Sequence, residues 1–340
     1  MVESSPRFHK LFHADWSMHP HGRWFASAVW ETGSWLLSGP TRVPDLDHYV
    51  SDLLTASADG AVLAGFDFPI GLPLAFGQKT GCTDFSEALR LFGTGDWATF
   101  YDVAETPADI SPMRPFYPAK SGPSGTQSHA QLLHGLGLTK KQTYRQCEIG
   151  GPGTKTASPL FWTLGAAAVG KATISGWRDV IAPARQRGAR LWPFDGDLDD
   201  LATKGGLVLA ESYPGDAYGQ IGLSMAGKSK TNREDRRTLA PALLHWATSH
   251  NLRLSPHLDK AIQKGFAAKH GIDNGFDAVV GLLAMIAVVE GERAAAPDLS
   301  ADVLQWEGWI LGRQSAAAAG SVNTADNPPL EDEPSDSAPP

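Results

Sequence analysis

Four apolar stretches of this chain each carry a carboxylate at one end. The acids are Asp15 after residues 8–14, Asp67 after 61–66, Glu211 after 206–210, and Asp277 in the first turn of a stretch at 275–290, with Asp273 four residues earlier. Hard divalent cations prefer oxygen ligands, and two-metal hydrolysis of a phosphodiester needs several converging carboxylates. The repetition therefore predicts a carboxylate site for Mg²⁺ or Mn²⁺. Each acid alone also has a structural interpretation, as a turn cap or as a partner of a helix dipole.

Asp67 has the most informative surroundings of the four. The run Ala61–Phe66 is apolar throughout and predicts a strand that is buried on both faces. Pro69 and Pro73 prevent a helix from starting directly after Asp67 and predict a rigid exit from the sheet. Because ligands of open α/β sheets bind at the carboxyl ends of the strands, Asp67 is expected at a binding edge.

The pattern of the first 73 residues predicts three strands, a helix and a fourth strand. The strands lie at residues 8–17, 23–30, 33–37 and 61–66, and the helix at 44–58. Closely spaced strands favour an antiparallel meander. Later segments predict helices at 85–91, 177–187, 232–249, 256–269 and 275–290 and a strand at 206–213. Residues 106–159 are rich in Gly, Pro and Ser, and their interspersed aromatic and charged residues favour an ordered insertion over a site.

This order and four short motifs resemble an uncharacterised family of predicted nucleases with an RNase H-like fold, within the RuvC-like superfamily. The motifs are Ala14-Asp15-Trp16-Ser17, Gly65 to Pro73 (GFDFPIGLP), Glu211-Ser212-Tyr213-Pro214 and Phe276 to Leu282 (FDAVVGL). The resemblance implies an α/β fold with a mixed sheet and flanking helices. It implies one domain over residues 1–313 with an insertion at about 75–190, and the composition of 314–340 predicts a disordered acidic tail.

The same resemblance assigns roles to the acids. It implies that Asp15, Asp67 and Asp277 bind the metal, and that Glu211 is a fourth ligand or an acid that faces the substrate. Asp273 is a further candidate ligand because it would share a helix face with Asp277. The expected activity is hydrolysis of a phosphodiester in nucleic acid, in which the bound cation activates water and stabilises an in-line displacement.

Several basic and aromatic residues are candidates for substrate binding. Lys228, Lys230 and Arg233 follow the Glu211 strand and could hold a phosphate. Arg145 and Lys155 belong to the predicted insertion, and Trp16 beside Asp15 is a candidate surface for base stacking.

A competing pattern occurs at Gly222–Ser229. The stretch Gly222-Leu223-Ser224-Met225-Ala226-Gly227-Lys228-Ser229 matches the P-loop pattern G-x-x-x-x-G-K-[ST]. A P-loop needs a buried strand directly before its first glycine, whereas Pro214-Gly215 interrupts the chain here. A phosphotransferase that uses this loop therefore stays an alternative of lower rank. A second alternative is an RNase H-fold protein that binds a nucleotide or a partner without cutting.

Composition restricts the class of partner. The chain has 340 residues and a formal net charge of −8, which becomes −3 without the five acids of the tail. Such a balance does not suit a protein that grips long duplexes, so short, single-stranded or branched nucleic acid is the expected partner. Cys82 and Cys147 are too few for a disulfide framework, which favours a reducing cytoplasm. The run Ala278–Val289 is too short to span a membrane. The oligomeric state stays open.

Overall fold

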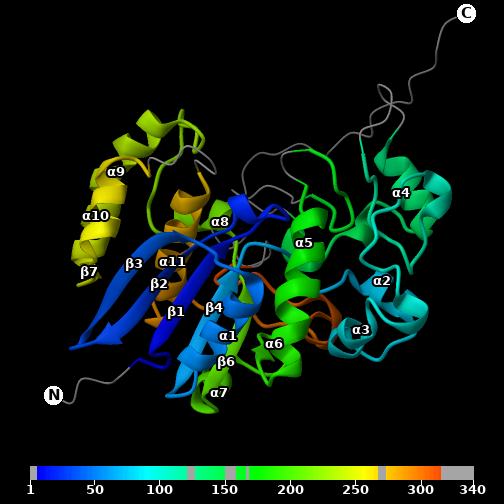
Figure 1. Cartoon of the computed structure of the whole chain (residues 1–340), viewed down its shortest axis with the longest axis horizontal. Helices are drawn as coiled ribbons and strands as arrows, with labels where there is room; N and C mark the ends of the chain where they lie inside the picture. Colours follow the sequence, from blue (N-terminus) through cyan, green and yellow to red (C-terminus); the bar gives the residue numbers. More distant parts are fainter. Residues whose placement is uncertain (1–5, 121–126, 150–157, 166–167, 267–272, 315–340) are drawn as a thin grey trace, which may run out of the picture.

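A mixed seven-stranded β-sheet runs through the middle of the molecule (Figure 1). The computed structural model describes residues 6–120, 127–149, 158–165, 168–266 and 273–314. The strand order is β5-β6-β4-β1-β2-β3-β7. The strands are β1 (Lys10–Asp15), β2 (Trp24–Glu31), β3 (Ser34–Arg42), β4 (Ala61–Phe66), β5 (Arg190–Leu191), β6 (Gly206–Glu211) and β7 (Arg253–Leu254).

The pairing of the strands follows the predicted order of elements. β1, β2 and β3 form the expected antiparallel meander, and β4 and β6 extend the sheet from β1 in the parallel sense. The α/β class and the mixed sheet are therefore confirmed. The two edge strands β5 and β7 have two residues each, which is too short for an alternating pattern to reveal them in the sequence.

Helices flank the sheet on both faces. They are α1 (Leu46–Ala56), α2 (Leu74–Gly77), α3 (Phe85–Leu91), α4 (His129–Leu136), α5 (Gly170–Gly176), α6 (Ala182–Gln186), α7 (Leu198–Thr203), α8 (Pro214–Gln220), α9 (Arg233–Ser249), α10 (Pro256–Gln263) and α11 (Asn274–Val289). A π-helical segment, Trp177–Ile181, joins α5 to α6, so the helix predicted at 177–187 begins earlier than expected. The helix predicted at 256–269 ends earlier, at Gln263.

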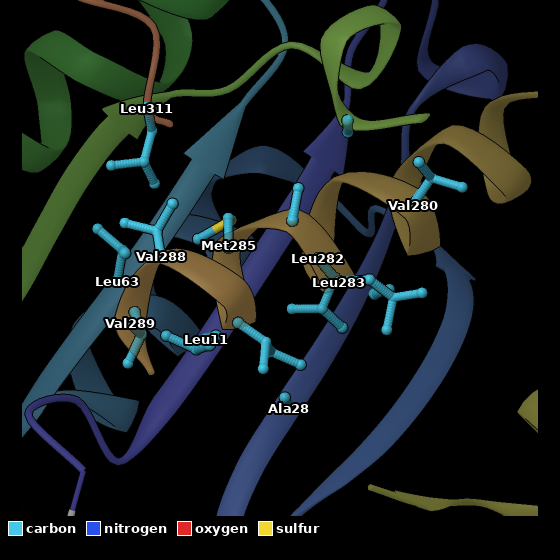
Figure 2. Close-up of a cluster of buried hydrophobic side chains, with 14 of the residues drawn as sticks. Leu11, Ala28, Leu63, Val280, Leu282, Leu283, Met285, Val288, Val289 and Leu311 are labelled. Atoms are coloured by element: carbon cyan, nitrogen blue, oxygen red, sulfur yellow. The ribbon is translucent and has the colours of Figure 1, made fainter. Parts of the chain in front are cut away.

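Helix α11 covers one face of the sheet. Every residue from Gly275 to Val289 is buried, which explains why this helix is apolar on all sides. It packs on β1, β2 and β3. Figure 2 shows Leu282, Met285 and Val288 of α11 together with Leu11 of β1 and Leu63 of β4. This packing fixes the position of the helix and therefore of the carboxylates at its N-terminal end.

The opposite face of the sheet is covered by α1 and by the segment 75–190. Val62, Ala64 and Leu209 point to this side and join a second hydrophobic cluster with Phe85, Trp177 and other residues of that segment. In Figure 1, α1 lies in front of the strands, with α5 and α6 beside it, and α11 lies behind them. The segment predicted to be an insertion thus supplies much of the core on one side of the sheet.

No helix within the described ranges is both long and apolar enough to cross a bilayer. This agrees with the expectation from the run Ala278–Val289.

Candidate active site

Asp15 and Asp67 lie side by side because β1 and β4 are parallel neighbours in register. Ala14 pairs with Phe66, so the next residue of each strand falls at the same edge of the sheet. The backbone N–H of Asp67 donates to the carbonyl of Ala14 at 3.3 Å, and the N–H of Trp16 donates to Asp67 Oδ1 at 2.6 Å. The two carboxyl groups are also hydrogen-bonded to each other. Such a bond requires one shared proton.

The surroundings favour that proton. Loss of hydration raises the pKa of Asp15 well above its ordinary value, and the charges of Asp67 and Asp277 raise it further. Loss of hydration also raises the pKa of Asp67, to about 7. Two carboxylates that share one desolvated site cannot both ionise cheaply. Any cation that enters would favour the doubly ionised form of the pair.

Helix α11 brings a third carboxylate to the same place. Asp277 lies in its first turn and is 2 % exposed, and its charge acts on both Asp15 and Asp67. The hydroxyl of Tyr218, on α8, donates to Asp277 Oδ1. Asp273 lies directly before the helix, and its side chain is 24 % exposed. The structure therefore brings Asp15, Asp67 and Asp277 to one place, with Asp273 beside Asp277.

One basic side chain enters this cluster. The ammonium group of Lys230 donates to Asp277 Oδ2 and lies 3.6 Å from Asp273 Oδ2. Burial disfavours the charge of Lys230, but Asp277 and Asp273 outweigh that effect and raise its pKa above the ordinary value. Lys230 is therefore an internal counterion of the cluster, which is a different contact from the predicted one to substrate phosphate.

The chemistry of these donors fits a hard divalent cation. All of them are carboxylate oxygens, and the mutual repulsion of Asp15, Asp67 and Asp277 would fall if a cation lay between them. In the structure, the pair Asp15 and Asp67 favours a proton, and Asp277 binds the ammonium group of Lys230. Across the described ranges, no group of three or more His, Cys, Asp or Glu side chains is placed so that it could hold a metal ion. Asp15, Asp67 and Asp277 are the residues that would hold one.

Glu211 is not part of this cluster. Phe66 and Glu211 are paired residues of β4 and β6, and side chains of paired residues point to the same face of a sheet. Phe66 belongs to the core on the α1 side, whereas Asp67 is one residue further and points to the opposite side. The prediction that Glu211 faces the metal or the substrate is therefore corrected: a one-residue difference in register turns it to the other face.

The side chain of Glu211 points to Arg145 and forms an ion pair with it. The guanidinium group of Arg145 donates to both carboxylate oxygens of Glu211 at 2.7 Å and to Glu148 Oε1 at 2.9 Å. Arg145 is fully buried, so the prediction that it binds substrate is also corrected. Glu211 Oε2 accepts from the N–H of Ile70 at 2.7 Å, which ties the exit after Asp67 to this ion pair.

The predicted base-stacking residue is buried as well. Trp16 is 5 % exposed, packs edge-on against Phe66 and Phe68, and donates from Nε1 to Ser175 Oγ at 2.9 Å. Its ring is therefore core and cannot stack on a base. Tyr213, by contrast, is 43 % exposed; loss of hydration and the charge of Asp216 raise the pKa of its hydroxyl, and Lys230 and Asp277 act on it more weakly. Its position two residues after the edge acid Glu211 was the available signal for it in the sequence.

Two of the remaining basic candidates, Lys228 and Arg233, lie between α8 and the first residue of α9. Lys228 is partly exposed, and Arg233 is exposed at the start of α9, where its Nε donates to the carbonyl of Lys264 at 3.0 Å. Lys155 lies outside the described residues. The P-loop interpretation is wrong in its context, because helix α8 and not a strand precedes Gly222, and α9 begins only at Arg233.

Comparison with known proteins gives no relative: no family model, no curated protein and no solved structure matches this chain.

Proposed function

We propose that this protein is a metal-dependent hydrolase of phosphodiester bonds in nucleic acid, built on an RNase H-like fold. The observation that carries the proposal is the meeting of Asp15, Asp67 and Asp277, from β1, β4 and α11, in one desolvated cluster. The order β1-β2-β3-α1-β4 is the one on which the resemblance to the RNase H-like fold rests. A cytoplasmic location is part of the proposal and rests on the low cysteine content of the sequence.

The roles of the side chains follow from their positions. Asp15, Asp67 and Asp277 would hold Mg²⁺ or Mn²⁺, and Tyr218 would keep Asp277 oriented through its hydrogen bond. When bound, the cation supplies Lewis acidity and positive charge for the displacement at phosphorus. Lys228 and Arg233 lie close in sequence to Lys230 and would bind phosphates of the strand. Tyr213 is 43 % exposed, with the guanidinium group of Arg313 over its ring at 5.6 Å, and the exposed part of the ring would stack on a base.

The substitution Asp67→Asn tests the proposal. It keeps the size of the side chain and the acceptor for the N–H of Trp16 but removes the charge that a metal needs. We expect Mn²⁺-dependent cleavage of single-stranded and branched DNA and RNA to fall at least about a hundredfold. We also expect the rise in melting temperature on addition of Mn²⁺ to disappear, because a ligand that binds only the folded state stabilises it by mass action.

Asp59→Asn is the matched control. Asp59 is exposed at the other end of the same strand, directly before Gly60 and β4. This variant should cleave and respond to Mn²⁺ like the parent. The proposal fails if the parent protein cleaves no nucleic acid and gains no stability from millimolar Mg²⁺ or Mn²⁺. Binding of metal and single strands without cleavage would instead favour the non-catalytic binding protein.

A further inference from the structure

Lys230 interacts with every aspartate of the candidate active site. It donates to Asp277, lies 3.6 Å from Asp273, and its charge acts on Asp15 and Asp67. In the part of the chain that the structure describes, it is the only Lys or Arg that forms an ion pair with Asp273 or Asp277. Lys230 is therefore the ion-paired positive charge of a cluster that the proposed function assigns to a divalent cation, and the charge of Arg236 acts on Asp273 and Asp277 without an ion pair.

We infer that Lys230 is the resident cation of the metal-free site, which a divalent metal must displace from Asp277 in order to bind. This inference rests on the proposed function: the ammonium group of Lys230 competes with the metal of the proposed active site. Both cations need Oδ2 of Asp277, since the hydroxyl of Tyr218 already donates to Oδ1. A metal and the ammonium group at the same oxygens would also repel each other.

The side chain of Lys230 can leave without rearrangement of the fold. The guanidinium group of Arg236, which is fully buried, donates to the backbone carbonyl of Lys230 and holds the main chain in place. The Lys230 side chain is 44 % exposed, whereas that of Asp277 is 3 % exposed. Its four-carbon stem therefore has solvent to swing into. After release, the ammonium group remains at the mouth of the site, where it can bind a substrate phosphate.

Displacement has a measurable cost in metal affinity. If the ion pair is closed in about nine of ten molecules, only about a tenth of the sites are open and the apparent Kd for metal is about tenfold above the intrinsic one. Lys230→Met keeps a stem of similar length but removes the competitor. Lys230→Arg keeps a positive charge that can pair with Asp277.

The experiment is a Mn²⁺ titration of the melting temperature of the full-length protein. We expect the Kd of Lys230→Met for Mn²⁺ to be at least about tenfold lower than that of the parent. We expect the Kd of Lys230→Arg to be equal to or higher than that of the parent. Lys264→Met removes one charge from an exposed lysine and should leave the Kd within about twofold of the parent value.

The outcomes separate this inference from the proposed function. If the parent binds Mn²⁺ and Lys230→Met binds it no more tightly, the inference is overturned and the proposed metal site stands. If neither protein is stabilised by Mn²⁺, the metal site itself is wrong. Tight binding by Lys230→Met alone supports both.

A second measurement uses the unmutated protein and does not depend on whether Lys230→Met folds. Reductive methylation with formaldehyde and cyanoborohydride modifies accessible lysines, and mass spectrometry of the peptides reports each position. We expect Mn²⁺ to increase the labelling rate of Lys230 severalfold, because the ion pair opens, and to leave that of Lys264 unchanged. An unchanged or lower rate at Lys230, at a Mn²⁺ concentration that raises the melting temperature, would contradict displacement.

Discussion

The carboxyl groups of Asp15 and Asp67 share a proton that the surrounding protein favours. Asp15 is 7 % exposed, and the neighbouring Asp277 adds a further negative charge. In such a pair the two protonation steps belong to the pair and not to either residue alone. A function that needs both carboxylates ionised therefore depends on a cation, and a protein without one holds the proton instead.

This proton makes the stability of the metal-free protein depend on pH. The pKa of Asp67 is raised to about 7 in the folded protein, above the value of about 3.9 for an unfolded chain. Between these values the folded state binds more protons, so the free energy of unfolding falls as the pH rises from about 4 to about 7. We expect urea unfolding of the metal-free protein to show this slope and Asp67→Asn to reduce it, with the part that comes from Asp15 remaining. Asp59→Asn should keep the slope of the parent, and an equally steep slope in Asp67→Asn would show that the pair does not titrate as described.

Helix α11 positions Asp277 through a close contact with β1. His13 lies on β1 beneath the helix, is fully buried, and its Nδ1 is 3.0 Å from the carbonyl oxygen of Ala278. Burial lowers the pKa of His13 to about 4, so the ring is neutral. The helix can approach because it carries glycine at this point: a Cβ on Gly281 would come within 2.1 Å of His13 Cε1.

Gly281→Ala should therefore separate the helix from the sheet. We expect a loss of about 2–4 kcal/mol in the free energy of unfolding, because the ring of His13 lies between the helix and the sheet. Gly219→Ala on α8 is the matched control. A Cβ there would meet nothing within 4 Å, so this change should be neutral or stabilise by up to about 1 kcal/mol. Both values come from urea unfolding, and equal effects of the two changes would contradict the close contact at His13.

The ion pair of Arg145 with Glu211 joins the segment 75–190 to strand β6. Arg145 also donates to the carbonyls of Ile70 and Glu307, at 3.2 and 3.0 Å, so one buried side chain joins three distant parts of the chain. Removal of one partner of a buried ion pair leaves the other charge without compensation.

Arg145→Met should lower the free energy of unfolding by about 3–5 kcal/mol. Glu211→Gln should cost less, because Glu148 still pairs with Arg145 and the amide oxygen can still accept from Ile70. The double variant should lose less free energy of unfolding than the sum of the two single changes. In Arg145→Met alone the charge of Glu211 is buried without a partner, and in the double variant that charge is absent. Urea unfolding of the four proteins forms the cycle. Additive effects would mean that Arg145 and Glu211 do not stabilise each other.

The sequence was sufficient for the order β1-β2-β3-α1-β4 and for β6, α9, α10 and α11, but not for the two-residue edge strands or for the faces of the sheet. Buried strands that are apolar throughout, such as β4 and β6, carry no alternation that shows which side an edge residue faces. The edge position of Glu211 was therefore predicted and its direction was wrong. Local charge suggested a role for Lys230, yet its contact with Asp277 joins residues 47 positions apart. Nothing in the local pattern distinguished Tyr218, because its role arises from the packing of α8 against α11.

The charge of the whole molecule limits how it can hold nucleic acid. The formal net charge is −8, and the candidate site itself consists of aspartates. Near it, the candidates for phosphate contacts are Lys228, Lys230 and Arg233, because Arg145 is buried in an ion pair. A strand bound at this site would therefore be held by few phosphates and by stacking on Tyr213.

Few phosphate contacts give a shallow dependence of affinity on salt. For single strands, three neutralised phosphates predict a slope of about −2 in a plot of log K against log salt concentration. We expect this slope for a single-stranded oligonucleotide in the presence of Ca²⁺, a cation that fits carboxylate sites but is chosen here to hold the substrate uncut. Replacement of Lys228 and Arg233 by Met should bring the slope to about −0.7, with one contact left. Tyr213→Ala should weaken binding by about 1–3 kcal/mol at every salt concentration without a change of slope, since stacking releases no counterions. A slope steeper than about −4 for the parent would require a basic surface beyond these three side chains, and duplex binding would then have to be considered again.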